Sequence, residues 1–218
     1  MSTTKDTKDK LQKSTKTRKD KTVFVSEEDY LKRDAVAKTK SEYHAGKVMA
    51  MAGAQEIHNR IVGNLIRILG NCAVEADCQV YPSDFLLYLP ECEKYVYPDI
   101  TVVCEELVLS KQSRKGLDVM TNPKIVVEVL SKSTEEYDLN DKMDCYLKLE
   151  SLEELVIVNS DMKSVKVYSK ITKSEWNLKV YEENENQENQ QEIAIKIGDC
   201  KIAMKDIYRS IGFKKEEK

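Results

Sequence analysis

The sequence contains no long apolar run. None of its apolar stretches approaches the roughly 20 residues that a membrane-spanning helix needs. The first 21 residues also contain no apolar segment of the signal-peptide type. Hydrophobic residues make up 41% of the chain and charged residues 33%, a balance typical of a globular protein with a strongly charged surface. We therefore expect a cytoplasmic protein that does not interact with membranes.

Closely spaced cysteine pairs are absent as well. The cysteines are scattered and none forms a Cys-x-x-Cys pair, which argues against structural zinc. A disulfide framework is typical of short secreted chains rather than of a chain with 218 residues. We therefore expect reduced thiols, several of them packed in the core. The six positions are Cys72, Cys78, Cys92, Cys104, Cys145 and Cys200.

The start of the chain is basic and has few apolar residues. Residues 1–21 hold eight Lys or Arg and three Asp residues, whereas the whole chain has a formal net charge of −3. Such an arm could touch nucleic acid, but its composition favours a disordered, solubilising tail. We expect this arm over residues 1–22, a single domain over 23–210 and a charged tail over 211–218.

Between these ends, apolar periodicity predicts helices that alternate with groups of strands. A short helix should follow an N-cap at Ser26, and a long helix should span 55–74, where isoleucines and leucines recur at helical spacing. Further helices are predicted over 134–149 and near 204–208. Strands are predicted at 42–44, 47–51, within 78–104, from 125, and at 155–158, 165–169, 176–181 and 193–197. This order predicts an α/β (α+β) fold with a mixed sheet.

One predicted strand contains an unexpected charge. Glu128 interrupts the apolar, β-branched run over residues 125–130, a run typical of a buried strand. A carboxylate taken out of water is destabilising unless it is paired, hydrogen-bonded or bound to a metal. Glu128 is therefore the first candidate for a functional residue.

Two other features could belong to the same site. Asp99 follows Pro98 at the start of another apolar strand, and Pro98 suits the first residue of that strand because proline cannot donate to a ladder. In the helix predicted over 134–149, Asp138, Lys142 and Tyr146 lie at i, i+4 and i+8 and therefore share one face.

Asp99, Glu128 and Lys142 together would suffice for metal-dependent hydrolysis of a phosphodiester. Mg²⁺ usually takes one or two carboxylates, with water and substrate phosphate completing its shell. An ammonium nearby can orient water or neutralise phosphate charge. Each residue also has a structural interpretation: Asp99 could cap a turn, Glu128 could pair with a cation, and Lys142 could pair with Asp138 on the surface. Alone, the pattern has little specificity.

The wider motifs are more specific. PDITVVC at 98–104, PKIVVEVLSKSTEEYDLNDKMDCY at 123–146 and EYHAGKVMAMAGAQEIHNRIVGNL at 42–65 resemble the Uma-two family of bacterial endonuclease-like proteins. The resemblance runs from about Ser26 to Tyr208. It implies a restriction-endonuclease-like fold of the PD-(D/E)xK type, in which helices flank a mixed central sheet. It also implies that Asp99 and Glu128 are the metal-binding acids.

The chain departs from the superfamily pattern at one position. That pattern places a lysine two residues after the second acid, where this chain has Leu130. In the Uma-two family, the lysine is inferred to lie on the helix that follows the strand. For this chain, the resemblance therefore implies Lys142.

Two further residues match positions of the family, and a third residue is a candidate on its own sequence context. Glu42 matches the family's upstream acid and is either a further ligand or water-positioning carboxylate, or a charge at the end of a strand. His58 matches the family's helix-start histidine, and we favour a hydrogen bond near the helix N-terminus over a phosphate contact. Asp84 is a weaker candidate, because a turn after Pro82 explains it.

These inferences predict a Mg²⁺- or Mn²⁺-dependent endonuclease acting on DNA, with Asp99, Glu128, Lys142 and Glu42 as catalytic residues. The alternative is a catalytically inactive protein of the same fold that binds nucleic acid or a protein partner. The intact acids and Lys142 favour the enzyme, and the acidic body of the chain favours the alternative. A homodimer is expected by analogy with enzymes that must cut two strands.

Overall fold

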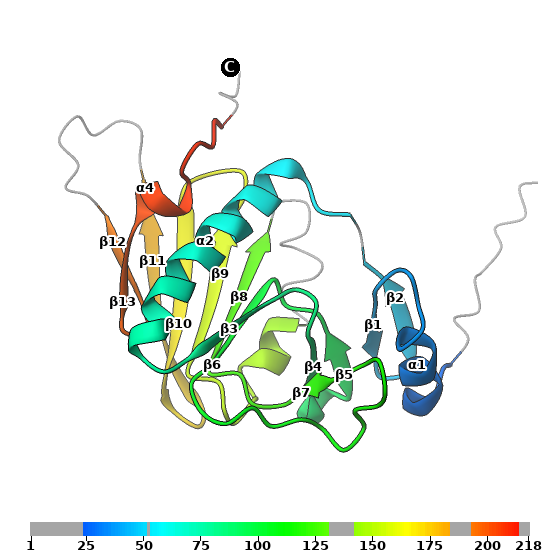
Figure 1. Ribbon diagram of the computed structural model, residues 1–218. Coiled ribbons are helices and arrows are strands. Elements are labelled where there is room, and N and C mark those ends of the chain that lie inside the picture. Colours follow the sequence, from blue (N-terminus) through cyan, green and yellow to red (C-terminus); the bar gives the residue numbers. More distant parts are fainter. Residues whose placement is uncertain (1–23, 52, 131–141, 184–192, 214–218) are drawn as a thin grey trace, which may run out of the picture.

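The computed structural model describes residues 24–51, 53–130, 142–183 and 193–213 (Figure 1). In these ranges the chain forms helices, two larger β-sheets and one two-stranded sheet. None of the helices in this part of the chain has the length and apolar character required to span a membrane. The predicted basic arm and most of the predicted tail lie outside the described residues, so the domain boundaries stay predictions.

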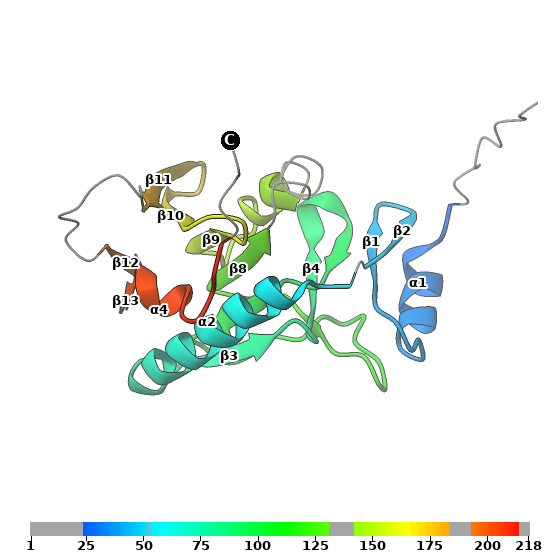
Figure 2. The same cartoon turned by 90° about the horizontal axis from the view of Figure 1, so that it is seen from above.

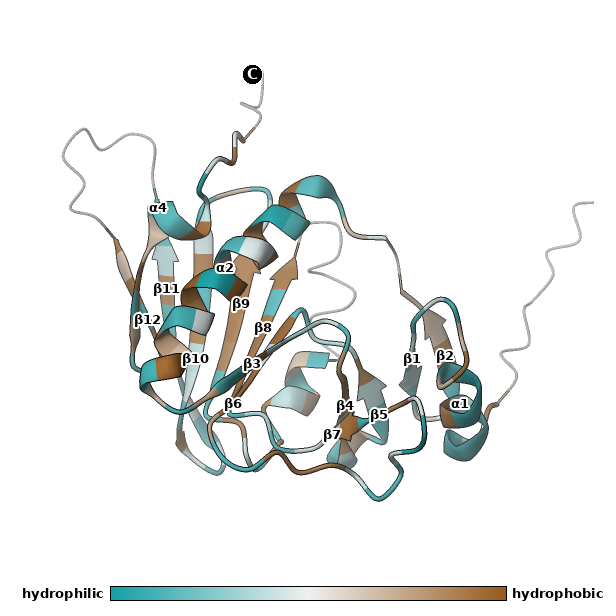
Figure 3. Ribbon diagram, viewed as in Figure 1, coloured by the Kyte–Doolittle hydropathy of each residue, from teal (hydrophilic) through white to brown (hydrophobic). Residues whose placement is uncertain are grey.

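The larger sheet has six strands in the order β11-β10-β9-β8-β6-β3. Strands β8 and β9 run parallel and the other neighbours run antiparallel, so the sheet is mixed, as predicted. Figure 3 shows that its central strands are largely apolar, as expected of strands that are covered on both faces. The strands are β3 (Gln79–Pro82), β6 (Ile100–Val103), β8 (Ile125–Leu130), β9 (Glu154–Asn159), β10 (Ser164–Thr172) and β11 (Glu175–Glu182).

The second sheet has five strands in the order β2-β1-β5-β4-β7. Helix α1 (Glu27–Asp34) packs on it through the buried Tyr30 and Leu31. As predicted, Ser26 caps this helix, because its Oγ accepts a hydrogen bond of 3.1 Å from the Asp29 amide. The strands are β1 (Ser41–His44), β2 (Lys47–Ala50), β4 (Leu86–Leu89), β5 (Lys94–Val96) and β7 (Val119–Met120).

Helix α2 (Glu56–Glu75) covers one face of the six-stranded sheet. Its buried residues Ile61, Leu65 and Leu69 recur every four positions and face the sheet as one stripe. Helix α4 (Met204–Ile207) and the hairpin of β12 (Ala194–Ile197) and β13 (Cys200–Ala203) complete this core. Figures 1 and 2 place them at the end of the molecule opposite to α1, β1 and β2.

The opposite face of the six-stranded sheet packs against a second core. Residues 142–146 are helical, and Cys145 and Tyr146 are buried there together with Leu149. Strands β4 and β5 of the five-stranded sheet contribute to the same cluster. This core therefore lies between the two sheets.

The chain crosses from one sheet to the other between β5 and β6. Strand β5 ends at Val96 in the five-stranded sheet, and β6 begins at Ile100 in the six-stranded sheet. Pro98 therefore lies in the connection, so the prediction that it is the first residue of the strand is wrong. A proline suits this position because its missing N–H leaves no ladder bond to satisfy.

Most predicted elements are confirmed within one to three residues, but two strands escaped prediction. β7 has only two residues, and β13 follows β12 so closely that the sequence suggested a single strand. The helix predicted over 134–149 is observed at 142–146, and residues 131–141 lie outside the described part of the chain.

The prediction of reduced cysteines is wrong, because the six cysteines form three disulfide bonds. The partners are 128, 26 and 53 residues apart, so the pairs are created by tertiary structure and carry no local spacing signal. For example, Gln79 pairs with Val103 across β3 and β6, which places the next residues outward, Cys78 and Cys104, opposite each other. The cytoplasmic location stays a prediction.

Opening the bond Cys72–Cys200, which closes the longest loop, should destabilise the fold. A cross-link restricts the unfolded chain more when its loop is longer, so the Cys72→Ala/Cys200→Ala variant should lose about 2–4 kcal/mol of unfolding free energy. Urea denaturation of the variant and the unreduced wild type measures the difference. Alkylation of all six cysteines in unreduced, denatured wild type would contradict the pairing.

Candidate active site

Glu128 points into the core between the two sheets. Along β8, Ile125, Val127 and Val129 pack on the α2 side, so Glu128 faces the opposite side with Val126. Only 7% of Glu128 is exposed to solvent. Its carboxylate accepts a hydrogen bond of 2.6 Å from the Tyr146 hydroxyl at Oε1. The acid that interrupts the apolar strand is therefore buried, and hydrogen-bonded from the helical segment 142–146.

Asp99 is hydrogen-bonded to two successive residues of β8, Glu128 and Val129. The Val129 amide donates to Asp99 Oδ2 at 2.8 Å, and the Asp99 amide lies 3.4 Å from Glu128 Oε2. Register explains the proximity, because Ile100, the residue after Asp99, pairs with Val127, the residue before Glu128. The two predicted acids therefore lie side by side where the chain leaves the five-stranded sheet.

Lys142 reaches the same site from the helical segment. Its Nζ donates to Glu42 Oε1 at 2.7 Å, and its positive charge also acts on Glu128. Leu130, which occupies the usual lysine position, packs against the core between the sheets. The structure thus places an ammonium group at the acids without a lysine at position 130.

Glu42 comes from β1 of the five-stranded sheet and is 6% exposed. It accepts hydrogen bonds from the Tyr97 amide, at 3.1 Å, and from Lys142. Burial by itself would raise the pKa of Glu42, but the neighbouring His44, Lys142 and Tyr97 amide together hold this pKa below its ordinary value. Glu42 is therefore an ionised partner that holds Lys142 in place.

The pKa of Glu128 is shifted in the opposite direction from the pKa of Glu42. Burial raises the pKa of Glu128 to about 7, the Lys142 charge opposes this rise, and the neighbouring Asp99 carboxylate adds to it. The Tyr146 hydroxyl lowers this pKa and the Glu42 charge raises it. Adding positive charge beside Glu128 and Asp99 would therefore stabilise both carboxylates.

Two histidines lie beside the acids, and the favoured prediction of a hydrogen bond from His58 near the helix N-terminus is confirmed. His58 Nε2 lies 3.0 Å from Asp99 Oδ2, and this hydrogen bond raises the pKa of His58 although burial opposes it. His44 was missed, although its position two residues after Glu42 in a strand predicts the same face. Its Nε2 is buried 3.4 Å from Glu42 Oε2, without a hydrogen-bond partner among the described residues.

Two other candidates do not belong to the described site. Asp84 is 81% exposed and pairs with Lys40, so it is a surface turn residue. Asp138 lies outside the described residues. The site that the structure assembles therefore consists of Asp99, Glu128, Lys142 and Glu42, surrounded by His44, His58 and Tyr146.

The donor set fits a hard divalent cation such as Mg²⁺ or Mn²⁺. Both hydrogen bonds to Asp99 go to Oδ2, so Oδ1 is the oxygen left for a cation in the described part of the chain. No group of three His, Cys, Asp or Glu side chains within the described ranges could hold a metal ion. A cation here would therefore take two carboxylates, and water and phosphate would complete its shell.

Comparison with known proteins is consistent with this geometry. The profile of a family described as "Uma2: Putative restriction endonuclease" matches residues 27–198, which include all the site residues above. The chain belongs to the Uma2 family. Two curated proteins from Synechocystis sp. are similar to this Uma2 protein. "Uncharacterized protein sll1609" is 32% identical over 72% of this chain and 87% of its own length. "Uncharacterized protein slr1290" is 29% identical over 87% of this chain and 94% of its own length.

A solved structure shares the fold of this Uma2 protein. It is described as "a putative nuclease belonging to DUF820" from Anabaena variabilis and aligns with a TM-score of 0.63. The alignment covers 83% of this chain and 95% of the other, at 15% sequence identity. The predicted mixed sheet flanked by helices is confirmed, and this solved structure shares it.

The raised pKa of Glu128 predicts a pH-dependent stability of the metal-free protein. The folded state binds the Glu128 proton more tightly than the unfolded chain, so stability should fall as pH rises from 4.5 to about 7 and then level off. Glu128→Gln lacks this titration. Between pH 4.5 and about 7, the unfolding free energy of the Glu128→Gln variant should therefore rise relative to that of the wild type by on the order of 3 kcal/mol. Urea denaturation with a chelator measures this gain, and a pH-independent difference would refute the raised pKa.

Proposed function

We propose that this protein is a metal-dependent endonuclease that hydrolyses phosphodiester bonds in DNA. The observation that carries the proposal is the position of Lys142, which bonds to Glu42 at 2.7 Å and whose charge acts on Glu128 beside Asp99. This arrangement supplies the lysine that the strand lacks at Leu130. Membership of a family described as "Putative restriction endonuclease" and a fold shared with a protein described as "a putative nuclease" support the same reaction class.

Asp99 and Glu128 would hold the metal. A divalent cation bound there would supply positive charge against the phosphate that is being cleaved. His58 holds Asp99 through Oδ2, and Tyr146 holds Glu128 through Oε1. Because these bonds fix the carboxylates, they limit the reorganisation needed when the substrate arrives.

Lys142 would act on the phosphate or on the attacking water. Its ammonium can donate to a phosphate oxygen and neutralise charge that develops there, and it can orient a water molecule by a hydrogen bond. Glu42 keeps Lys142 directed into the site through the bond between Nζ and Oε1. Glu42 is thus a positioning residue, whose own anchor is the Tyr97 amide.

Purified protein should nick supercoiled plasmid DNA when Mg²⁺ or Mn²⁺ is added, and a chelator should stop the reaction. Glu128→Gln and Asp99→Asn should each lower the rate by at least about 100-fold, because each removes a charged ligand. The matched control is Asp84→Asn, which changes an exposed carboxylate outside the site. Gel assays measure the rates. Cleavage at the wild-type rate by Glu128→Gln would contradict the assignment of the active site to Glu128.

Removing the ammonium should separate catalysis from metal binding. Lys142→Met should lower the cleavage rate about 100-fold, and Mg²⁺ should still bind because Asp99 and Glu128 remain. Glu42→Gln should cause a smaller loss, since glutamine keeps an acceptor for Lys142. Calorimetric titration with Mg²⁺ accompanies the rate measurements. A Lys142→Met protein that cleaves as fast as the wild type would show that Lys142 has no catalytic role.

If the wild type binds DNA but never cleaves it, the alternative function, a catalytically inactive protein of the same fold that binds nucleic acid, replaces the endonuclease.

The homodimer stays a prediction. Analytical ultracentrifugation of the same samples tests it.

A further inference from the structure

Glu128 begins a row of side chains that crosses the six-stranded sheet toward its edge. Glu128 pairs with Ile157, Ile157 pairs with Lys166, and Lys166 pairs with Val180. Residues directly opposite each other on neighbouring strands point to the same face. Lys166 therefore shares a face with Glu128, two strands away, which is about 10 Å at the usual strand spacing.

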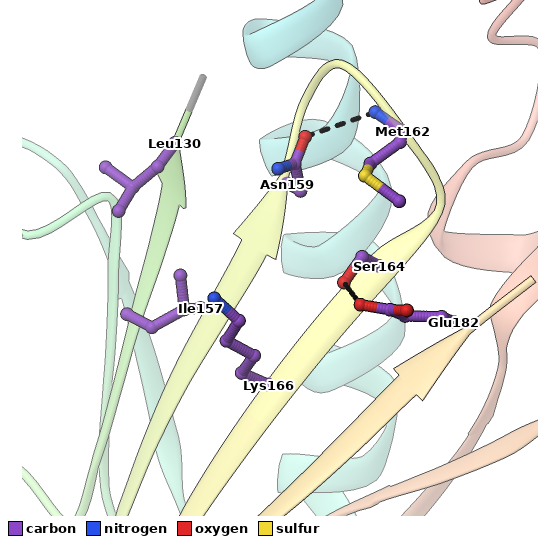
Figure 4. Close-up of a pocket in the computed structure, with 7 residues that line it drawn as sticks. All are labelled: Leu130, Ile157, Asn159, Met162, Ser164, Lys166 and Glu182. Carbon is purple, nitrogen blue, oxygen red and sulfur yellow. Dashed lines mark hydrogen bonds between the residues drawn. The ribbon is translucent and has the colours of Figure 1, made fainter. Parts of the chain in front are cut away.

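A small cavity of about 130 Å³ lies on this face. Figure 4 shows the Lys166 side chain extending toward Ile157, the residue that pairs with Glu128 on the neighbouring strand. Across the cavity, Asn159 Oδ1 accepts the amides of Asp161, at 2.7 Å, and Met162, at 3.1 Å. These bonds fix the orientation of the Asn159 amide, and in Figure 4 its Nδ2 points to the side of Leu130. The cavity thus presents an ammonium and an amide donor.

We propose that this cavity binds a backbone phosphate of the DNA strand being cleaved, next to the phosphate at Glu128. The proposal deepens the proposed function and rests on it. A strand whose scissile phosphate lies at Asp99 and Glu128 carries further phosphates along its length, and Lys166 faces them from the same side of the sheet. Lysine and amide N–H groups are the usual donors to phosphate oxygens. Because the whole chain is acidic, binding a polyanion requires local cations such as this one.

Glu182 gives the proposal a second, opposite test. It lines the same cavity, and Ser164 Oγ donates to its Oε1 at 3.3 Å (Figure 4). A carboxylate here opposes a bound phosphate. Removing the charge of Lys166 should therefore weaken DNA binding, and removing the charge of Glu182 should strengthen it.

The experiment compares Lys166→Gln and Glu182→Gln in the full chain. The matched control is Lys179→Gln, because Lys179 is exposed on β11 and pairs with Val167 of the opposite face. Fluorescence anisotropy with a labelled DNA oligonucleotide, single-stranded and duplex, measures affinity over a range of salt. The Glu128→Gln background prevents cleavage during binding. Plasmid nicking is measured with variants that retain Glu128, and it gives kcat and KM.

Lys166→Gln should weaken binding about 3- to 10-fold at low salt and reduce the slope of log affinity against log salt by about 0.7–0.9. In cleavage it should raise KM and leave kcat unchanged. Glu182→Gln should shift affinity the other way, and Lys179→Gln should match the wild type.

The outcomes separate the two hypotheses. If wild type cleaves DNA and Lys166→Gln behaves like Lys179→Gln, the cavity is not a phosphate site and the endonuclease stands. If wild type binds without cleaving and Lys166→Gln still reduces the salt slope, the endonuclease fails and the phosphate site stands. If wild type neither binds nor cleaves DNA, both are overturned.

Discussion

The burial of Glu128 is the constraint around which the site is organised. A carboxylate enclosed by apolar strands is destabilising unless donors and positive charge surround it. Tyr146 supplies a hydroxyl at 2.6 Å, Lys142 supplies charge, and the Asp99 amide lies within reach. The pKa of Glu128 is still raised to about 7, because burial raises it and the Asp99 and Glu42 carboxylates add negative charge. A cation at the proposed metal site would add positive charge beside these carboxylates.

The position of this site follows from the change of sheet between β5 and β6. One sheet provides Glu42, the other provides Glu128, and Asp99 lies where the chain leaves the first for the second. The helical segment 142–146 packs between the sheets and provides Lys142 and Tyr146. Glu42, Glu128, Lys142 and Tyr146 thus come from strands or from the helical segment, and Asp99 comes from the short connection immediately before β6. Elements packed in the hydrophobic cores therefore hold most of the site in place.

The sequence predicted what depends on local pattern and family motifs. The stripe of α2, the apolar strands and the Ser26 cap were all readable, because period and capping chemistry are local. Asp99 and Glu128 stood out because acids contradict an apolar strand. The contact of His58 with Asp99 and the pairing of Cys72 with Cys200 could not be read in this way. They join residues 41 and 128 positions apart, and only the packed fold brings these together.

The bond between Glu42 and Lys142 joins residues 100 positions apart in the chain. It can form only after both sheets and the helical segment have docked. A partly folded chain, for example one still emerging from a ribosome, holds Glu128 without its lysine. The proposed hydrolytic site would thus be complete only when the fold is complete. A partly folded chain would therefore lack the complete site that the proposed cleavage of DNA requires.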